Sequence, residues 1–123
     1  MIAVVDYGMG NVGSVLNALA LLGVPAKLTA DPKDFAEATH IILPGVGAYS
    51  DGMRELRELG LVPLLEKEVL ERGKLFLGIC LGMQLLSSMG EEGGETKGLG
   101  FIPGRTRLLK AERLRLPHIG WDD

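Results

Sequence analysis

Residues 75–86, with the sequence LFLGICLGMQLL, decide the fold. The run at 75–79 is apolar at nearly every position, which is typical of a strand buried on both faces inside a parallel sheet. From Leu81 to about Met89 the apolar residues recur at helical spacing, so a helix is predicted to begin at once. A buried strand that turns directly into a helix is the repeating unit of an α/β protein.

The same alternation extends upstream. Short segments between turn-forming residues, apolar at 2–5 and 41–43, predict further strands, and amphipathic segments between them predict helices. The expected strands are 2–5, 26–29 and 41–43, and the expected helices are 11–22, a short one from 32, 50–59 and 62–73. Strands alternating with helices imply right-handed crossovers. We therefore expect an α/β fold, a parallel sheet with helices on both faces.

Capping signals accompany two of these helices. Asn11 is placed to cap the first, and Gly23 follows its end, where glycine is favoured. Asp31 and Pro32 predict a cap and a first-turn proline for the second, and Asp34 adds a negative charge near the positive end of its dipole.

Composition narrows the class of protein. The chain has 123 residues, 46% hydrophobic and 24% charged, with a net charge of -3 and one cysteine. These values predict one ordered domain, and a single thiol fits a reducing, cytoplasmic environment. No apolar stretch reaches the length of a membrane span, and the slight acidity gives no reason to expect nucleic acid. Neither His40 nor His118 has a recognisable spacing to Cys80, and no metal site is predicted.

Cys80 is the candidate nucleophile. Gly78 and Gly82 flank it in a G-x-C-x-G element between a predicted strand and a predicted helix. In this context a sharp turn presents the nucleophile, and the helix N-terminus favours the thiolate. The alternative is a small buried hydrophobe, the usual role of a free cysteine. The flanking glycines and the junction favour the nucleophile.

Two further segments are candidates for the same site. The loop 44–47 ends a predicted strand, so it should lie at the same carboxyl edge of the sheet as the cysteine. Its backbone amides at Val46 and Gly47, together with the amide of Leu81, could bind an oxyanion. Gln84 lies one helical turn beyond the cysteine, where its side-chain amide could hold a polar substrate.

A competing pattern is the G-x-G-x-x-G of residues 8–13, with Asp31 about 20 residues further on, as in dinucleotide sites. It leaves a nucleotide-binding α/β domain open as an alternative. Asp31 is already explained as a helix cap, however, and this reading gives the cysteine element no role.

Four segments resemble the class I glutamine amidotransferases, in order along the whole chain: DYGMGN at 6–11, PGVG at 44–47, GICLGMQLL at 78–86 and PHIGW at 117–121. The first and last resemble, more narrowly, the glutaminase subunits of imidazole glycerol phosphate synthases, which serve histidine biosynthesis. The resemblance implies a flavodoxin-like fold, here one partial domain over 1–123 that is incomplete at the C-terminus.

The resemblance also implies a mechanism and a partner. Cys80 would attack the carboxamide of glutamine, and the ammonia released would pass to a separate cyclase subunit in a heterodimer. No cofactor is implied. The family's oxyanion loop corresponds to Gly45, Val46 and Gly47, its second amide donor to Leu81, and its glutamine-holding amide to Gln84. The residues implied to face the cyclase are Asn11, Pro117, His118, Ile119, Gly120 and Trp121.

The sequence departs from the family in two respects. Asp122 stands where the family usually has Asn, and the late H-P-E segment that carries the family's catalytic His and Glu is not among these 123 residues. We therefore expect the N-terminal portion of a glutaminase. The alternative is a catalytically inactive module that binds the cyclase.

Overall fold

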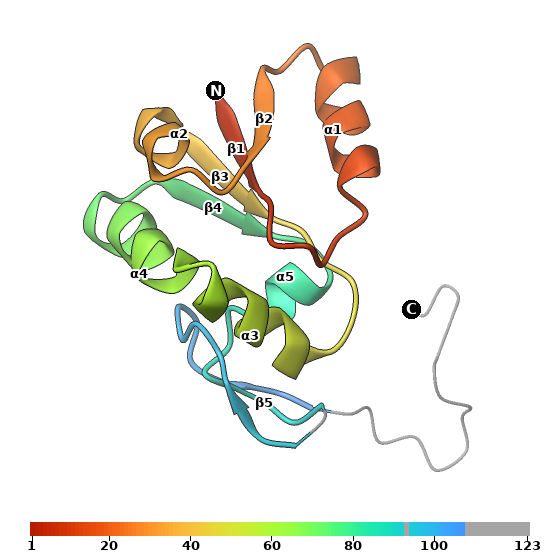
Figure 1. Ribbon diagram of the computed structural model, residues 1–123, viewed down its shortest axis with the longest axis vertical. Coiled ribbons are helices and arrows are strands. Elements are labelled where there is room, and N and C mark those ends of the chain that lie inside the picture. Colours follow the sequence, from red (N-terminus) through yellow and green to blue (C-terminus); the bar gives the residue numbers. More distant parts are fainter. Residues whose placement is uncertain (93, 108–123) are drawn as a thin grey trace.

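A computed structural model describes residues 1–92 and 94–107. Its centre is a four-stranded parallel sheet in the order β2-β1-β3-β4 (Figure 1). The strands are β1 (Ile2–Val5), β2 (Ala26–Thr29), β3 (His40–Leu43) and β4 (Leu75–Gly78). The α/β class and all four predicted strands are confirmed, with ends that move by at most one residue.

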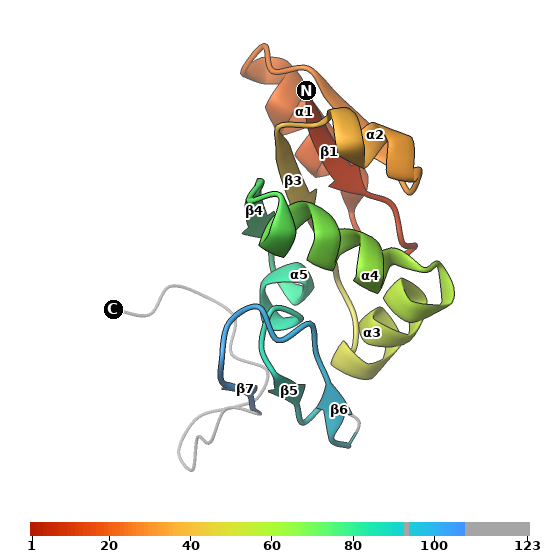
Figure 2. The same cartoon turned by 90° about the vertical axis from the view of Figure 1, so that its left-hand side faces the viewer.

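Helices cover the two faces of this sheet unequally (Figures 1 and 2). The helical elements are α1 (Val12–Leu21), α2 (Pro32–Glu37), α3 (Tyr49–Glu58), α4 (Leu61–Leu65), the π-helical segment η1 (Glu66–Glu71) and α5 (Leu81–Gln84). The larger core joins Phe35 of α2, Met53 of α3 and Leu65 of α4 to the sheet. The smaller core on the other face holds Leu19 of α1 against Val4 and Ile42.

The prediction that β4 is buried on both faces was wrong. β4 is an edge strand of the described sheet, and Leu75 and Leu77 are 65% and 55% exposed. On that face α1 lies over β1 and β2, and a hollow of about 290 Å³ opens between Leu19 and the two leucines. An apolar sequence reports what a strand can bury, whereas the neighbouring elements decide what it does bury.

Beyond the cysteine, the helix predicted for 81–89 is too long. It ends at Gln84, and Met89–Gly90 forms β5 of a small sheet with β6 (Thr96–Lys97) and β7 (Arg105–Thr106), in the order β6-β5-β7. Ser87 explains the early end, because its hydroxyl donates to the carbonyl of Gln84 at 2.7 Å. Serine side chains of this kind compete with helical hydrogen bonds.

The helix predicted for 62–73 also differs, since it begins at Leu61 and passes from α4 into η1. Within η1 the carboxylate of Glu68 is 2% exposed and pairs with Lys74 at 2.8 Å and Arg72 at 3.1 Å. The same Lys74 ammonium donates to the carbonyl of Ala36 at 2.8 Å. A buried ion pair of this kind connects η1 to the end of α2, and periodicity alone does not reveal it.

Within the described residues, no helix is long and apolar enough to cross a membrane.

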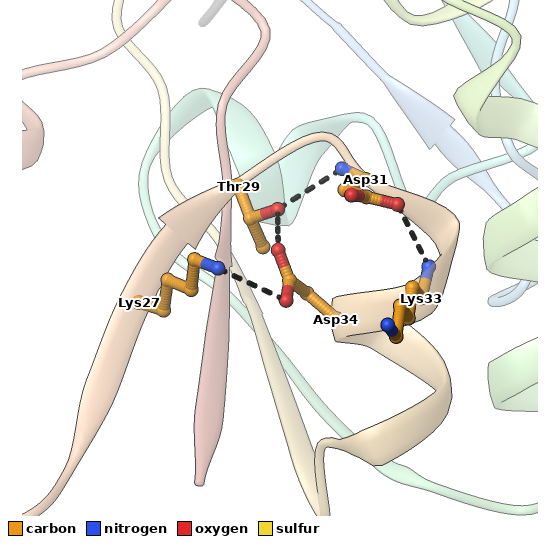
Figure 3. Close-up of polar contacts among 5 residues, drawn as sticks. All are labelled: Lys27, Thr29, Asp31, Lys33 and Asp34. Atoms are coloured by element: carbon orange, nitrogen blue, oxygen red, sulfur yellow. Dashed lines mark hydrogen bonds and ion pairs between the residues drawn. The ribbon is translucent and has the colours of Figure 1, made fainter.

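The cap predicted for α2 is confirmed, and Figure 3 shows its hydrogen bonds. The carboxylate of Asp31 accepts from the Lys33 amide at 3.0 Å, and the Asp31 amide donates to the Thr29 hydroxyl at 3.0 Å. That hydroxyl donates to Asp34 at 2.5 Å, and Lys27 donates to the other Asp34 oxygen at 3.1 Å. This network joins β2 to the first turn of α2.

The cap predicted for α1 was wrong in its contact. Asn11 occupies the N-cap position, but its side chain makes no capping hydrogen bond. Its backbone, with φ −85° and ψ 70°, lies outside the extended region from which a cap side chain reaches the first amides.

Asp34 gives the fold an acid-sensitive contact. The hydrogen bond from Thr29 and then the one from Lys27 lower the pKa of Asp34. A lowered pKa in the folded state contributes stability above the unfolded pKa, and this contribution is lost as the pH falls through the folded value. We expect Asp34→Asn to be less stable than the wild type at about pH 7 and nearly equal to it at about pH 2.

Urea unfolding at both pH values measures this difference. Asp51→Asn on α3, whose side chain is 46% exposed beside Arg54, is the control. An equal gap between wild type and Asp34→Asn at the two pH values would show that Asp34 does not contribute in this way.

Candidate active site

Cys80 lies between β4 and α5. The turn that joins these two elements is at the carboxyl edge of the parallel sheet (Figure 1). The φ of Cys80 is 54° and its ψ is −118°, and no other non-glycine residue in the described part of the chain has a positive φ. Such a conformation costs on the order of 1–3 kcal/mol and persists where the surrounding structure holds it. The side chain is exposed, so the thiol is accessible. The predicted sharp turn is present, and the buried structural role is excluded.

The two glycines around Cys80 are required by close approaches of the backbone. A Cβ on Gly82 would lie 1.8 Å from the carbonyl oxygen of Leu43, at the end of β3. A Cβ on Gly78 would lie 2.7 Å from both the Gly82 carbonyl oxygen and the Met83 Cα. The G-x-C-x-G spacing therefore lets the first turn of α5 pack directly on the ends of β3 and β4.

The loop 44–47 lies against this turn, as predicted. The amide of Leu81 donates to the carbonyl of Gly45 at 3.1 Å, and the amide of Val46 donates to the carbonyl of Met9. The Gly45 carbonyl and the Val46 amide belong to one peptide unit, which is thus held at both ends. Gly47, with φ 121°, follows at the surface.

Two of the three amides expected to form the oxyanion hole, those of Val46 and Leu81, are already occupied in this structure. Both Val46 and Leu81 are brought to the site, yet each amide already donates to a carbonyl of the protein. The physical reason is general, because amides that no ligand engages pair within the fold. Both hydrogen bonds involve the peptide unit 45–46, because its carbonyl accepts from Leu81 and its amide donates to Met9.

Residues 6–11 pack against the loop 44–47. The Tyr7 hydroxyl donates to the Pro44 carbonyl at 2.5 Å, and a Cβ on Gly10 would lie 3.6 Å from Pro44 and 3.7 Å from Gly45. The glycine loop of 8–13 therefore packs on the loop 44–47, and Asp31 serves as the α2 cap. Neither feature of the dinucleotide pattern is arranged as that alternative requires.

Of the remaining predicted site residues, the structure describes Gln84 and Asn11 but not those from 117 onward. Gln84 lies one helical turn from Cys80 and is half-buried. Its backbone amide donates to the Cys80 carbonyl at 3.2 Å. Asn11 is exposed at the start of α1, next to the segment that contacts the loop 44–47. Residues 117–121 and Asp122 lie outside the described residues. Within those described, no group of three or more His, Cys, Asp or Glu side chains could hold a metal ion.

Tyr7 and Met9 were not among the predicted site residues, although both contact the candidate loop. Their partners, Pro44 and Val46, lie 37 residues away along the chain in each case. The one signal in the sequence was the position of Tyr7, a large aromatic residue between the first strand and the glycines that follow it. Spacing cannot pair residues that far apart.

Comparisons with known proteins found a matching family model, related sequences and a related structure. The family model described as glutamine amidotransferase class-I matches residues 3–121. The chain is 50% identical over 123 residues to "Imidazole glycerol phosphate synthase subunit HisH 2" of Methanococcus maripaludis, covering 99% of this chain and 60% of that one. It is also 50% identical over 121 residues to the HisH subunit of Moorella thermoacetica, covering 98% of this chain and 57% of that one.

A solved structure shares the fold. The protein described as "Crystal structure of glutamine amidotransferase" superimposes with a TM-score of 0.72 at 24% identity, over 87% of this chain and 56% of its own. The present chain spans 57–60% of the length of these two curated relatives.

Proposed function

This chain belongs to the class I glutamine amidotransferase family, and from that premise we propose that it hydrolyses glutamine with Cys80 as the nucleophile. The ammonia would pass to the cyclase subunit of an imidazole glycerol phosphate synthase, in histidine biosynthesis. The observation that carries the proposal is the exposed, positive-φ Cys80 beside the loop 44–47. The 50% identity to HisH subunits supports the narrower assignment.

In the proposed reaction the Cys80 sulfur attacks the carboxamide carbon of glutamine. The tetrahedral intermediate expels ammonia and leaves a glutamyl thioester, which water then converts to glutamate and the free thiol. A base must take the thiol proton and return it to the leaving amine. In the family this base and its orienting carboxylate come from the H-P-E segment, which the 123 residues do not include.

The amides of Val46 and Leu81 would stabilise the negative oxygen of the intermediate. Both first have to leave their present acceptors, the carbonyls of Met9 and Gly45. Rotation of the 45–46 peptide unit would free the two donors together, because it carries one donor and the acceptor of the other. Oxyanion donors of this kind are each worth roughly two to three orders of magnitude in kcat.

The partner would act on the same peptide unit. Asn11 is exposed two residues beyond Met9, whose carbonyl holds the Val46 amide. A cyclase bound at Asn11, and at residues 117–121, would therefore shift the segment whose Met9 carbonyl holds the Val46 amide. This arrangement would link ammonia production to the presence of the partner.

Gln84 offers a specific test of glutamine binding. If its side-chain amide holds the substrate equally before and during reaction, Gln84→Leu should raise KM about tenfold with little change in kcat. The measurement is glutamate release by a cyclase subunit assembled with a glutaminase subunit that joins this chain to an H-P-E segment. Asn17→Leu, an exposed amide on α1, is the matched control and should leave both constants unchanged.

Two results would contradict the proposal. An unchanged KM in Gln84→Leu would remove Gln84 from the substrate site. A wild-type complex that assembles but releases no glutamate would instead favour the inactive cyclase-binding module.

A further inference from the structure

Tyr7 lies directly after β1 and is 2% exposed, with its ring inside the larger core. Its hydroxyl donates to the carbonyl of Pro44 at 2.5 Å, at the start of the loop 44–47. Burial raises the pKa of Tyr7, so the hydroxyl keeps its proton and remains a donor at any physiological pH. Pro44 and Gly45 are themselves buried, so their carbonyls depend on partners within the protein.

The hydroxyl also touches the loop sterically. A Cβ on Gly45 would lie 2.2 Å from the Tyr7 oxygen and 3.1 Å from the Leu81 Cβ. Gly45 is thus enclosed between Tyr7 on one side and the residue after the nucleophile on the other. The contact from Tyr7 to the cysteine turn passes through this one glycine.

We propose that Tyr7 is a positioning residue of the glutaminase site, whose hydroxyl fixes the 44–45 peptide unit. This inference rests on the proposed function. With the 44–45 unit held, rotation that frees the Val46 and Leu81 amides is confined to the next unit, 45–46. The Val46 amide then turns about a fixed end while the Leu81 amide loses its acceptor in place, so the two donors reach one defined geometry.

Removal of the hydroxyl would leave the buried Pro44 carbonyl without a donor. A buried acceptor that loses its partner costs more than the bond itself contributed, so the loop would shift to find another. The 45–46 unit would then lose its fixed end, and its bonds to Leu81 and Met9 would open more often. The oxyanion would meet poorly placed donors, whereas binding of the substrate would change little.

Hydrogen exchange on the full chain tests this without any requirement for catalysis. Tyr7→Phe should speed exchange of the Val46 and Leu81 amides about tenfold beyond any change in global stability. Tyr49→Phe is the matched control, because it removes another buried hydroxyl, one that lies 3.2 Å from the Ser87 carbonyl. In that variant exchange of the two amides should not change. Unchanged exchange in Tyr7→Phe would overturn the inference.

Kinetics of a complex supply the second measurement, in which a cyclase subunit is assembled with a glutaminase subunit that joins this chain to an H-P-E segment. Tyr7→Phe should lower kcat for glutamate release about tenfold and leave KM unchanged, since the donors act on charge that develops only in the transition state. An equal kcat in Tyr7→Phe and wild type would overturn the inference. A wild-type complex without glutaminase activity would contradict the proposed function, and the exchange result would still decide the role of Tyr7.

If Tyr7→Phe does not fold, the wild-type chain provides the readout. A hydroxyl proton that donates to a buried carbonyl exchanges slowly with solvent, so NMR should detect the Tyr7 hydroxyl proton near neutral pH. Its exchange at the rate of a free tyrosine would overturn the inference.

Discussion

Cys80→Ala is expected to abolish glutamine hydrolysis by the proposed complex, a cyclase subunit assembled with a glutaminase subunit that joins this chain to an H-P-E segment, and to lower kcat by about a thousandfold or more. The reason is chemical, because alanine has no atom that can form the glutamyl thioester. Cys80 is also the one cysteine of the sequence, so no neighbouring thiol can replace it. The measurement is glutamate release at saturating glutamine.

The control for this variant is the cyclase reaction supplied with added ammonia instead of glutamine. Free ammonia bypasses the glutaminase, so the cyclase assembled with Cys80→Ala should use added ammonia as well as it does with the wild type. Assembly itself should be unchanged, because the exposed thiol is not part of either hydrophobic core. Glutamate release within about tenfold of wild type would refute a role for Cys80 as nucleophile.

Gly82→Ala should have the largest effect on stability, about 3–5 kcal/mol, or prevent folding altogether. The added Cβ would lie 1.8 Å from the Leu43 oxygen and 2.6 Å from the Leu43 carbonyl carbon. Both atoms are backbone atoms of β3, which is paired with β1 and β4 and cannot move alone. The clash can be relieved only by separating α5 from the sheet.

Gly13→Ala is the matched control, measured like Gly82→Ala by urea unfolding. Gly13 lies within α1, and a Cβ there meets no atom within 4 Å. Alanine should stabilise this helix by about 0.5–1 kcal/mol. A Gly82→Ala variant within about 1 kcal/mol of wild type would show that the close packing of α5 on β3 is not required.

The strands were predictable because their signals are local. The apolar runs at 2–5 and 41–43 end at Asp6 and Pro44, the short segment at 26–29 is followed by Asp31 and Pro32, and the structure places strands within one residue of all three. The exposure of Leu75 and Leu77 was not predictable, since it depends on which elements lie beside β4. The early end of α5 depends on the Ser87 hydroxyl, a competition that hydrophobic periodicity does not report.

The candidate site divides in the same way. The Cys80 turn follows from three positions close in sequence, so the G-x-C-x-G spacing was enough to predict it. The occupied amides of Val46 and Leu81 depend on contacts across the sheet edge, with Met9 and Gly45. The support from Tyr7 is equally distant in sequence. The sequence could indicate which amides gather here, but not the acceptors to which they are bound.

Mass spectrometry of the acid-quenched enzyme tests the central claim most directly. A cyclase subunit assembled with a glutaminase subunit that joins this chain to an H-P-E segment is mixed with glutamine and quenched in acid during turnover, and its peptides are analysed. The proposed mechanism predicts a glutamyl adduct on the peptide that contains Cys80, which disappears when glutamine is exhausted. Rapid glutamate release with an unmodified Cys80 peptide at every quench time, or with an adduct on another residue, would contradict it.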